Sequence, residues 1–180
     1  MVEILGKTPH ATTLRDLVIM RASLGEKPML ICRDEVLTYA DADRLSNRVA
    51  NALLARGIGK GDVVGTFMYN AVEQALIWFG CAKIGAIYAA LNVSLAKDDL
   101  AYSLNDTGAK LLVVDEELAP AFNEARSLLN FAPDTYVHGD VEAVPGAASA
   151  KDLLDAAETL PDADVGMTDP MCIVYTGGST

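Results

Sequence analysis

The last residues of the chain combine the types that proteins use to bind phosphate. Three apolar residues, Ile173 to Tyr175, precede the run TGGST. Glycines allow a backbone N–H to come close to an oxyanion, and hydroxyls add further donors. Open α/β sheets bind ligands beyond the carboxyl ends of their strands, where such a run would lie. The candidate phosphate-binding residues are Thr176, Gly177, Gly178, Ser179 and Thr180.

A second glycine-rich stretch, GIGKGD around Lys60, has the composition of a nucleotide-binding loop but the wrong position. Walker and dinucleotide-binding loops follow a strand and open a helix. Here the glycines follow a predicted helix and precede a predicted strand. We therefore expect a turn in which Gly57 ends the helix and Gly61 and Asp62 lead into the strand.

The cysteines and histidines are scattered along the chain. Cys32, Cys81 and Cys172 each lie within an apolar run and far from one another, which predicts buried, reduced thiols. His10 and His138 have no histidine, cysteine or carboxylate at metal-ligand spacing around them. We assign neither histidine a role, and the sequence identifies no metal ligand.

Composition excludes several classes of partner. The 180 residues fit a single domain, and 25 acidic residues against 14 lysines and arginines give a net charge of −11. A strongly acidic chain lacks the basic surface that nucleic acid requires. Any bound phosphate must therefore be held by backbone N–H groups or by groups outside these residues.

No targeting or membrane segment is predicted. The start, MVEILGKTPH, has an acid where a secretory signal carries positive charge. The apolar region 71–96 is interrupted by Glu73, Lys83 and Gly85, so it lacks the roughly 20 continuous apolar residues of a spanning helix. We expect a cytoplasmic protein without a transmembrane segment.

Predicted strands and helices alternate along the chain. Thr12 or Thr13 should cap the first helix and Thr38 the second, and the nearly all-apolar helix around Trp78 should be among the most buried. This alternation indicates an α/β fold: one domain or subdomain over residues 1–180, with a mostly parallel sheet covered by helices on both faces. The expected helices span 13–22, 37–57, 71–85, 97–108, 116–131 and 150–160, the expected strands span 29–32, 62–68, 86–91, 110–114, 135–138 and 172–176, and 139–150 and 161–170 should be irregular.

The closing stretch DPMCIVYTGGST resembles the opening of the phosphate loop of the acyl-CoA synthetase, or AMP-binding adenylate-forming, superfamily, DPAxIxYTSGTTGxPKG. The resemblance extends over residues 28–118, with a helix after TY, a GD strand entry, a KxGA turn and the run LNDTGAK. It implies the amino-terminal part of the large domain of an adenylate-forming enzyme. Gly177 departs from the pattern, because the family usually has serine there.

The resemblance also implies a reaction. The parent enzyme would use ATP and Mg²⁺ to convert a carboxylic acid to an acyl-adenylate, and would then transfer the acyl group to coenzyme A. Residues 77–92 are similar to the fatty-acyl branches, which favours a fatty or other lipophilic acid. Residues 176–180 would hold the phosphates, whereas the family's catalytic lysine, adenine-binding motif and carboxyl-terminal domain fall beyond Thr180. We expect these 180 residues alone to be inactive and to bind no cofactor tightly.

Other functions remain open. The parent could be an acyl-AMP ligase or a peptide-synthetase adenylation domain, and these residues could be a non-catalytic folding or interaction module. A dinucleotide-dependent oxidoreductase is disfavoured, because no glycine fingerprint follows an early strand. The sequence leaves undecided whether the acceptor is coenzyme A or a carrier protein, and it decides neither oligomeric state nor peripheral membrane contact.

Overall fold

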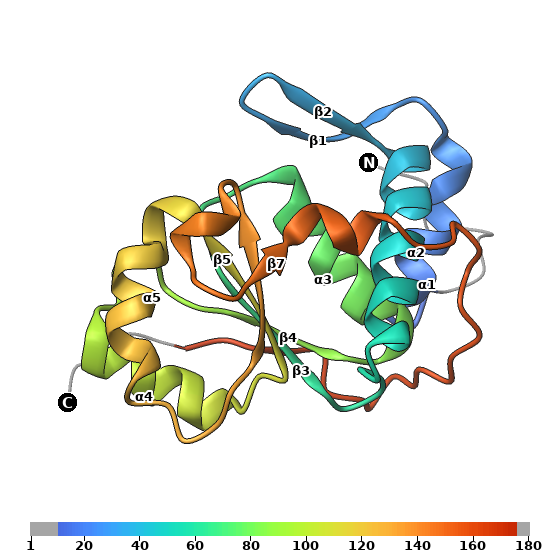
Figure 1. The fold of residues 1–180 in the computed structure, drawn as a ribbon. Helices are drawn as coiled ribbons and strands as arrows, with labels where there is room; N and C mark the ends of the chain where they lie inside the picture. Colours follow the sequence, from blue (N-terminus) through green and yellow to red (C-terminus); the bar gives the residue numbers. More distant parts are fainter. Residues whose placement is uncertain (1–10, 176–180) are drawn as a thin grey trace.

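The protein is built around a six-stranded parallel sheet. A computed structural model describes residues 11–175, and its strand order is β7-β6-β5-β3-β4-β8, with every neighbouring pair parallel (Figure 1). The strands are β3 Val63–Phe67, β4 Ile87–Ala90, β5 Leu111–Asp115, β6 Asp134–His138, β7 Ala148–Ser149 and β8 Cys172–Ile173. The predicted parallel sheet is confirmed.

Helices cover both faces of this sheet. One apolar cluster packs α1, α2 and α3 against one face, and a second packs α4 and α5 against the other (Figure 1). Strand β5, buried throughout, serves both: Leu111 and Val113 face the first cluster, and Leu112 and Val114 face the second. The helices are α1 Leu14–Arg21, α2 Tyr39–Ala55, α3 Val72–Ile84, α4 Lys97–Thr107 and α5 Ala119–Arg126.

The predicted helix caps are present. The Thr13 side chain accepts a hydrogen bond from the backbone N–H of Asp16, and Thr38 accepts one from Asp41. These caps satisfy N–H groups that have no partner within the helix. The end of α3 is also set by a nearby residue, because Gly85 has the left-handed backbone conformation that ends a helix.

Two strands near the amino terminus form a separate hairpin. Strand β1, Pro28–Cys32, does not join the parallel sheet but pairs antiparallel with β2, Glu35–Thr38, which the sequence analysis missed. A two-residue turn with Arg33 at a φ of 55° joins them. Strands joined by so short a turn must run antiparallel, because a parallel pair needs a long crossover.

Three element boundaries also differ from the prediction. The region 116–131 contains a short 3₁₀ turn followed by α5, which ends at Arg126. The α-helix begins only at Ala119 because Pro120 fits the first turn of an α-helix and not its interior. The region 150–160 is helical only as a 3₁₀ turn over Ala150–Leu154. The supposedly irregular region 139–150 contributes the edge strand β7 and a 3₁₀ turn.

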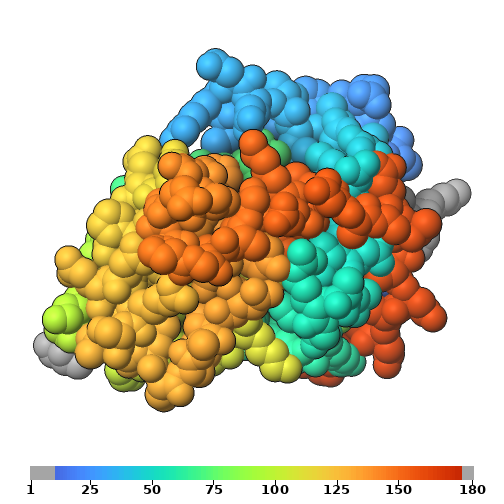
Figure 2. All heavy atoms as spheres, in the orientation of Figure 1, coloured from blue at the N-terminus to red at the C-terminus, as the bar shows by residue number. Residues whose placement is uncertain are grey.

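The segment after the 3₁₀ turn over Ala150–Leu154 is held against α2 by polar contacts. Arg48 contacts Glu158 at 2.7 Å, and Asn47 donates to the Glu158 carbonyl at 2.8 Å. Figure 2 shows this segment, in orange, lying against α2, in teal, on the molecular surface. The irregular end of the chain is therefore tied to the helical layer before it returns to the sheet as β8.

Helix α3 is the buried helix that the sequence predicted. The side chains of Leu76, Ile77, Cys81 and Ile84 are each at most 2% exposed. Trp78 is partly buried and stacks on Phe79 and Tyr88, with ring centroids 5.9 and 6.0 Å apart. Because α2 packs along α3, this helix connects the outer helices to the sheet.

Gly80 allows the close approach of α2 and α3. A Cβ at Gly80 would lie 2.6 Å from Cγ1 of Val49 and 3.2 Å from the backbone nitrogen of Ala50. Gly80→Ala should therefore lower the free energy of unfolding by about 1 to 3 kcal/mol, although alanine by itself favours a helix. Urea unfolding would measure this loss. Adding Val49→Ala should recover part of it, and a loss unchanged by Val49→Ala would contradict the proposed clash.

Candidate functional site

The predicted phosphate-binding run follows the strand β8. Backbone pairs join Tyr88 to Cys172 and Ala89 to Ile173, so β8 runs parallel to β4 and ends at the same edge of the sheet. This is the carboxyl edge, where open α/β sheets bind ligands. The candidates Thr176, Gly177, Gly178, Ser179 and Thr180 lie outside the residues that the structure describes.

Tyr175, immediately before this run, is anchored by its side chain. Its hydroxyl donates to Oδ2 of Asp106 at 2.7 Å and lies 3.3 Å from the carbonyl oxygen of Ser103. Burial, followed by the neighbouring carboxylate, raises the pKa of Tyr175 to about 12. The hydroxyl therefore stays protonated and able to donate at neutral pH.

A second feature of the same edge is a cavity of about 290 Å³ beyond β3, β5 and β6. The helix after β3 packs on one face of the sheet and the helix after β5 on the other, so these neighbouring strands form a topological switch point. The cavity is lined by four carboxylates and two permanent cations, and this excess of negative charge disfavours a phosphate ligand. Its charged lining residues are Arg33, Glu73, Asp115, Glu116, Glu117, His138 and Lys151.

His138 lies between two carboxylates in this cavity. Its Nε2 is 3.5 Å from Oε2 of Glu73, and its Nδ1 is 3.5 Å from Oδ2 of Asp115. The contact with Glu73 is the main cause that raises the pKa of His138, and it lowers the pKa of Glu73. The sequence predicted that His138 is isolated, and this prediction was wrong. The one signal that could have indicated its contacts was its position at the carboxyl end of a strand. His10 lies outside the described residues.

The His138 contact should make stability depend on pH. Because the folded-state pKa of His138 is raised above its usual 6.5, its stabilising contribution is full below that pH and is lost as pH rises through the folded value. Glu73 adds a contribution above its usual 4.5 that is lost at lower pH. Between about pH 6 and about pH 8, His138→Gln should lose less unfolding free energy than the unchanged protein. Urea titrations at both values would test this, and equal losses would contradict it.

No metal site is identified in the part of the chain that the structure describes. Within residues 11–175, no group of three or more histidines, cysteines, aspartates or glutamates is arranged to hold a metal ion. The side chains around His138 contact one another and are not placed around a common centre. We therefore place no magnesium ion on these residues.

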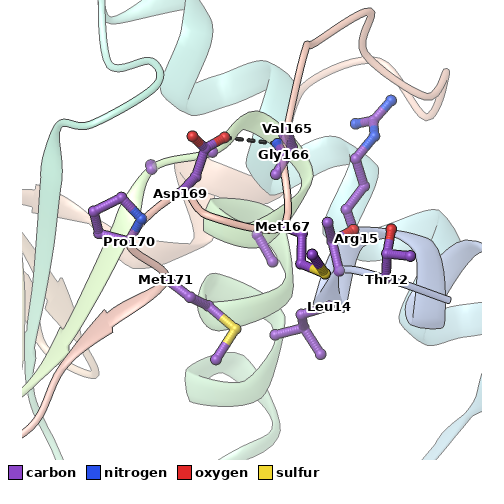
Figure 3. Close-up of a pocket in the computed structure, with 13 residues that line it drawn as sticks. Thr12, Leu14, Arg15, Val165, Gly166, Met167, Asp169, Pro170 and Met171 are labelled. Atoms are coloured by element: carbon purple, nitrogen blue, oxygen red, sulfur yellow. Dashed lines mark hydrogen bonds between the residues drawn. The ribbon is translucent and has the colours of Figure 1, made fainter.

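A further cavity, of about 220 Å³, lies at the opposite edge of the sheet. It is lined by Leu14 of α1, by Ala86 just before β4, and by Met167 and Met171 (Figure 3). In the loop that lines this cavity, the Asp169 carboxylate accepts a hydrogen bond from the backbone N–H of Gly166 at 2.7 Å. A position at the amino ends of the strands is not where this class of fold binds its substrates.

The GIGKGD stretch forms the predicted turn. Gly57 and Gly61 have φ values of 75° and 83°, and the Asp62 carboxylate accepts a hydrogen bond from the Gly59 N–H at 2.9 Å. Lys60 contacts Asp169 at 2.7 Å, so its ammonium already has a partner. Lys60 therefore makes a structural ion pair in this turn, as expected for a turn and not for a nucleotide-binding loop.

The prediction of three buried thiols holds for only one of them. Cys81 is buried in α3, and burial raises its pKa. Cys32 is partly exposed because β1 lies outside the central sheet, and Cys172 is exposed because β8 is an edge strand. All three are free thiols.

Comparisons with known proteins agree with the predicted fold and family. A family model described as AMP-binding enzyme matches residues 21–180. A 3-hydroxybenzoate–CoA/4-hydroxybenzoate–CoA ligase of Thauera aromatica is 35% identical over 158 residues, which cover 87% of this chain and 30% of that protein. The long-chain-fatty-acid–CoA ligase FadD13 of Mycobacterium tuberculosis is 35% identical over 148 residues, which cover 82% of this chain and 28% of that protein.

A solved structure gives the same result. An anthranilate CoA ligase, AuaEII, in complex with anthranoyl-AMP, superposes with a TM-score of 0.87 at 26% identity, covering 96% of this chain and 34% of that one. The chain thus spans about a third or less of the length of these three proteins. Among residues 11–175, no helix is both long enough and apolar enough to cross a membrane.

Proposed function

We propose a function from one premise: this chain belongs to the AMP-binding enzyme family. As part of a full-length protein, it would contribute the phosphate loop of an ATP-dependent acid–CoA ligase. The observation that carries the proposal is that β8 ends at the carboxyl edge of the parallel sheet, and that the TGGST run comes next in the sequence after Val174 and Tyr175, inside the family match.

The proposed role of the loop is electrostatic. Backbone N–H groups and hydroxyls of Thr176, Gly177, Gly178, Ser179 and Thr180 would hold the β and γ phosphates of ATP. Negative charge accumulates on the leaving pyrophosphate during adenylation, and donors already aimed at it lower the barrier. Gly177 lacks the hydroxyl that serine would supply, but it retains its backbone N–H.

The reaction follows from this grip. A substrate carboxylate oxygen attacks the α-phosphorus, the bond to the β-phosphate oxygen breaks, and acyl-AMP and pyrophosphate form. The thiol of coenzyme A then attacks the acyl carbon and AMP leaves, with a proton lost from sulfur. Mg²⁺ would offset the phosphate charge when bound. The rate enhancement comes from positioning the reactants and stabilising the developing negative charge, so a misplaced loop should weaken ATP binding and lower turnover.

The proposed substrate is a fatty or other lipophilic carboxylic acid. Relatives named for long-chain fatty acids and for hydroxybenzoates are equally similar to this chain, at 35% identity. Both substrate classes join a carboxylate to an apolar body, and this shared chemistry is what we propose. Chain length and ring structure would be set by residues outside this segment.

We further propose that the 180 residues alone neither adenylate an acid nor bind Mg-ATP tightly. Adenylation needs base, ribose and phosphates held together, and this segment would contribute to the phosphates only. A net charge of −11 also repels a polyanion. Calorimetry should give a dissociation constant of about 1 mM or weaker. A value below about 100 μM, or acid-dependent pyrophosphate release by this segment, would contradict the proposal.

The full-length protein provides the main test. Pyrophosphate release should require ATP together with a lipophilic acid such as palmitate or 4-hydroxybenzoate, and coenzyme A should be needed for product turnover. Adenylate formation without any response to coenzyme A would instead indicate an acyl-AMP ligase or a peptide-synthetase adenylation domain. No release with either acid would favour a non-catalytic module.

A further inference from the structure

The chain loses its backbone support just before the proposed phosphate loop. Strand β8 contains only Cys172 and Ile173, and it lies at an edge of the sheet. Val174, the next residue, is 74% exposed. Because the described pairing of β4 with β8 ends at Ile173, the backbone at Val174 and Tyr175 is held by something other than the sheet.

The side chain of Tyr175 supplies that support. Its ring packs against the apolar cluster beneath α4 and α5, and its hydroxyl contacts Oδ2 of Asp106 at 2.7 Å. A short hydrogen bond to a carboxylate is stronger than a hydrogen bond between two neutral groups. The ring is held by apolar packing, and its hydroxyl is held by Asp106. The backbone at Tyr175 is therefore held in place by α4, through Asp106.

Asp106 is poorly placed for the helix on which it lies. It belongs to the last turn of α4, where the partial negative charge of the helix end disfavours a carboxylate, and that turn contains no basic residue. Among the described residues, the bond from Tyr175 is the only hydrogen bond to the Asp106 side chain. A residue that opposes its own helix yet anchors the segment before a loop has the character of a positioning group.

We propose that Asp106 is a positioning residue that, by holding the Tyr175 hydroxyl, sets where residues 176–180 meet the phosphates of ATP. This inference rests on the proposed function. Asp106 touches no substrate and acts only through Tyr175. Displacements of about 1 Å can cost about a hundredfold in rate, so the loss of one anchor outside the site is enough to matter.

Mg-ATP binding by the full-length protein, measured by calorimetry, tests the proposal directly. Asp106→Ala and Tyr175→Phe should each raise the dissociation constant about tenfold or more, and the double variant should be no worse than either one. Asp106→Asn keeps an acceptor oxygen and should stay within about threefold of the unchanged protein. Asp99→Ala removes an exposed carboxylate from the same helix and should leave ATP binding unchanged.

Kinetics and spectroscopy separate positioning from general damage. In the same variants, KM for ATP should rise while KM for the acid stays constant. Their thermal midpoints should be no lower than that of Asp99→Ala, which removes a carboxylate from the favourable first turn of α4. Tyrosine NMR with carbon labelling, assigned by Tyr175→Phe, should show that Asp106→Ala lowers the pKa of Tyr175. ATP affinity in Asp106→Ala equal to that in Asp99→Ala, or additive losses in the double variant, would overturn the proposal. A protein that binds ATP but activates no acid would contradict the proposed function alone, and ATP affinity would still decide this inference.

Discussion

Asp43→Ala should lower the free energy of unfolding by about 3 kcal/mol, because it leaves a buried ammonium without its counter-ion. The Lys83 side chain is fully buried, and its Nζ donates to Asp43 Oδ1 at 2.7 Å, to the Asp43 carbonyl at 2.8 Å and to Asn47 Oδ1 at 2.6 Å. Removing one member of a buried pair costs about 3 to 5 kcal/mol. Asp43 is 28% exposed, so water limits the loss to the lower end of that range.

Replacing the lysine as well should reverse part of this loss. Lys83→Met has a similar volume and buries no charge, so the variant Asp43→Ala/Lys83→Met should be more stable than Asp43→Ala alone. Urea midpoints of the two single variants and the double variant would test this. A double variant as unstable as the sum of the single losses would show that the ion pair is not the cause.

The pH dependence of Asp43→Ala has a definite sign. Burial is the main cause that lowers the pKa of Lys83, and loss of the Asp43 carboxylate should lower this pKa further. At alkaline pH the unfolded chain then binds more protons than the folded chain, so the stability of the variant rises with pH. The gap between Asp43→Ala and the unchanged protein should therefore narrow as pH increases. A constant gap would contradict this account.

The first four helices could be predicted because their signals are local. Thr13 and Thr38 each cap a helix through a residue three positions later, and Gly85 ends α3 within one turn. Alternation of apolar strands with such helices is enough to indicate a parallel, covered sheet. The order of the strands in the parallel sheet depends on packing between distant segments, so periodicity alone could not supply it. The hairpin of β1 and β2 is local, but its signal is a two-residue turn and not a period.

The contacts of the charged residues could not be predicted, because their partners are distant in sequence. Lys83 interrupts an apolar stretch, which argued against a membrane span, yet its partner Asp43 lies 40 residues earlier. His138 is joined by Glu73 of α3 and by Asp115 of β5. Only the tertiary fold turns these separate charges into contacts. The glycine-rich run at 176–180 differs, because the proposal that it binds phosphate rests on its residue types, their order and their place after a strand, all of which the sequence contains.

In the full-length protein, Gly178→Val should lower kcat/KM for ATP by at least about a hundredfold, which corresponds to about 2.7 kcal/mol. Glycine allows the backbone to approach a phosphate, whereas a branched side chain occupies that space and penalises any positive φ. Gly177→Ser should stay within about tenfold, because one neutral hydrogen bond is worth about 0.5 to 1.5 kcal/mol. Steady-state kinetics with ATP varied at saturating acid would measure both effects.

Gly59→Val is the matched control, because a Cβ at Gly59 meets nothing within 4 Å and its φ is not positive. It introduces the same side chain into a turn at the amino ends of the strands, away from the proposed phosphate site. This control should keep kcat/KM for ATP within about twofold, and KM for the acid should be unchanged in every variant. If Gly178→Val is as active as Gly59→Val, the glycine makes no close approach to phosphate and the loop has no part in ATP binding. If Gly178→Val instead raises only KM for the acid, residues 176–180 contact the carboxylate rather than the nucleotide.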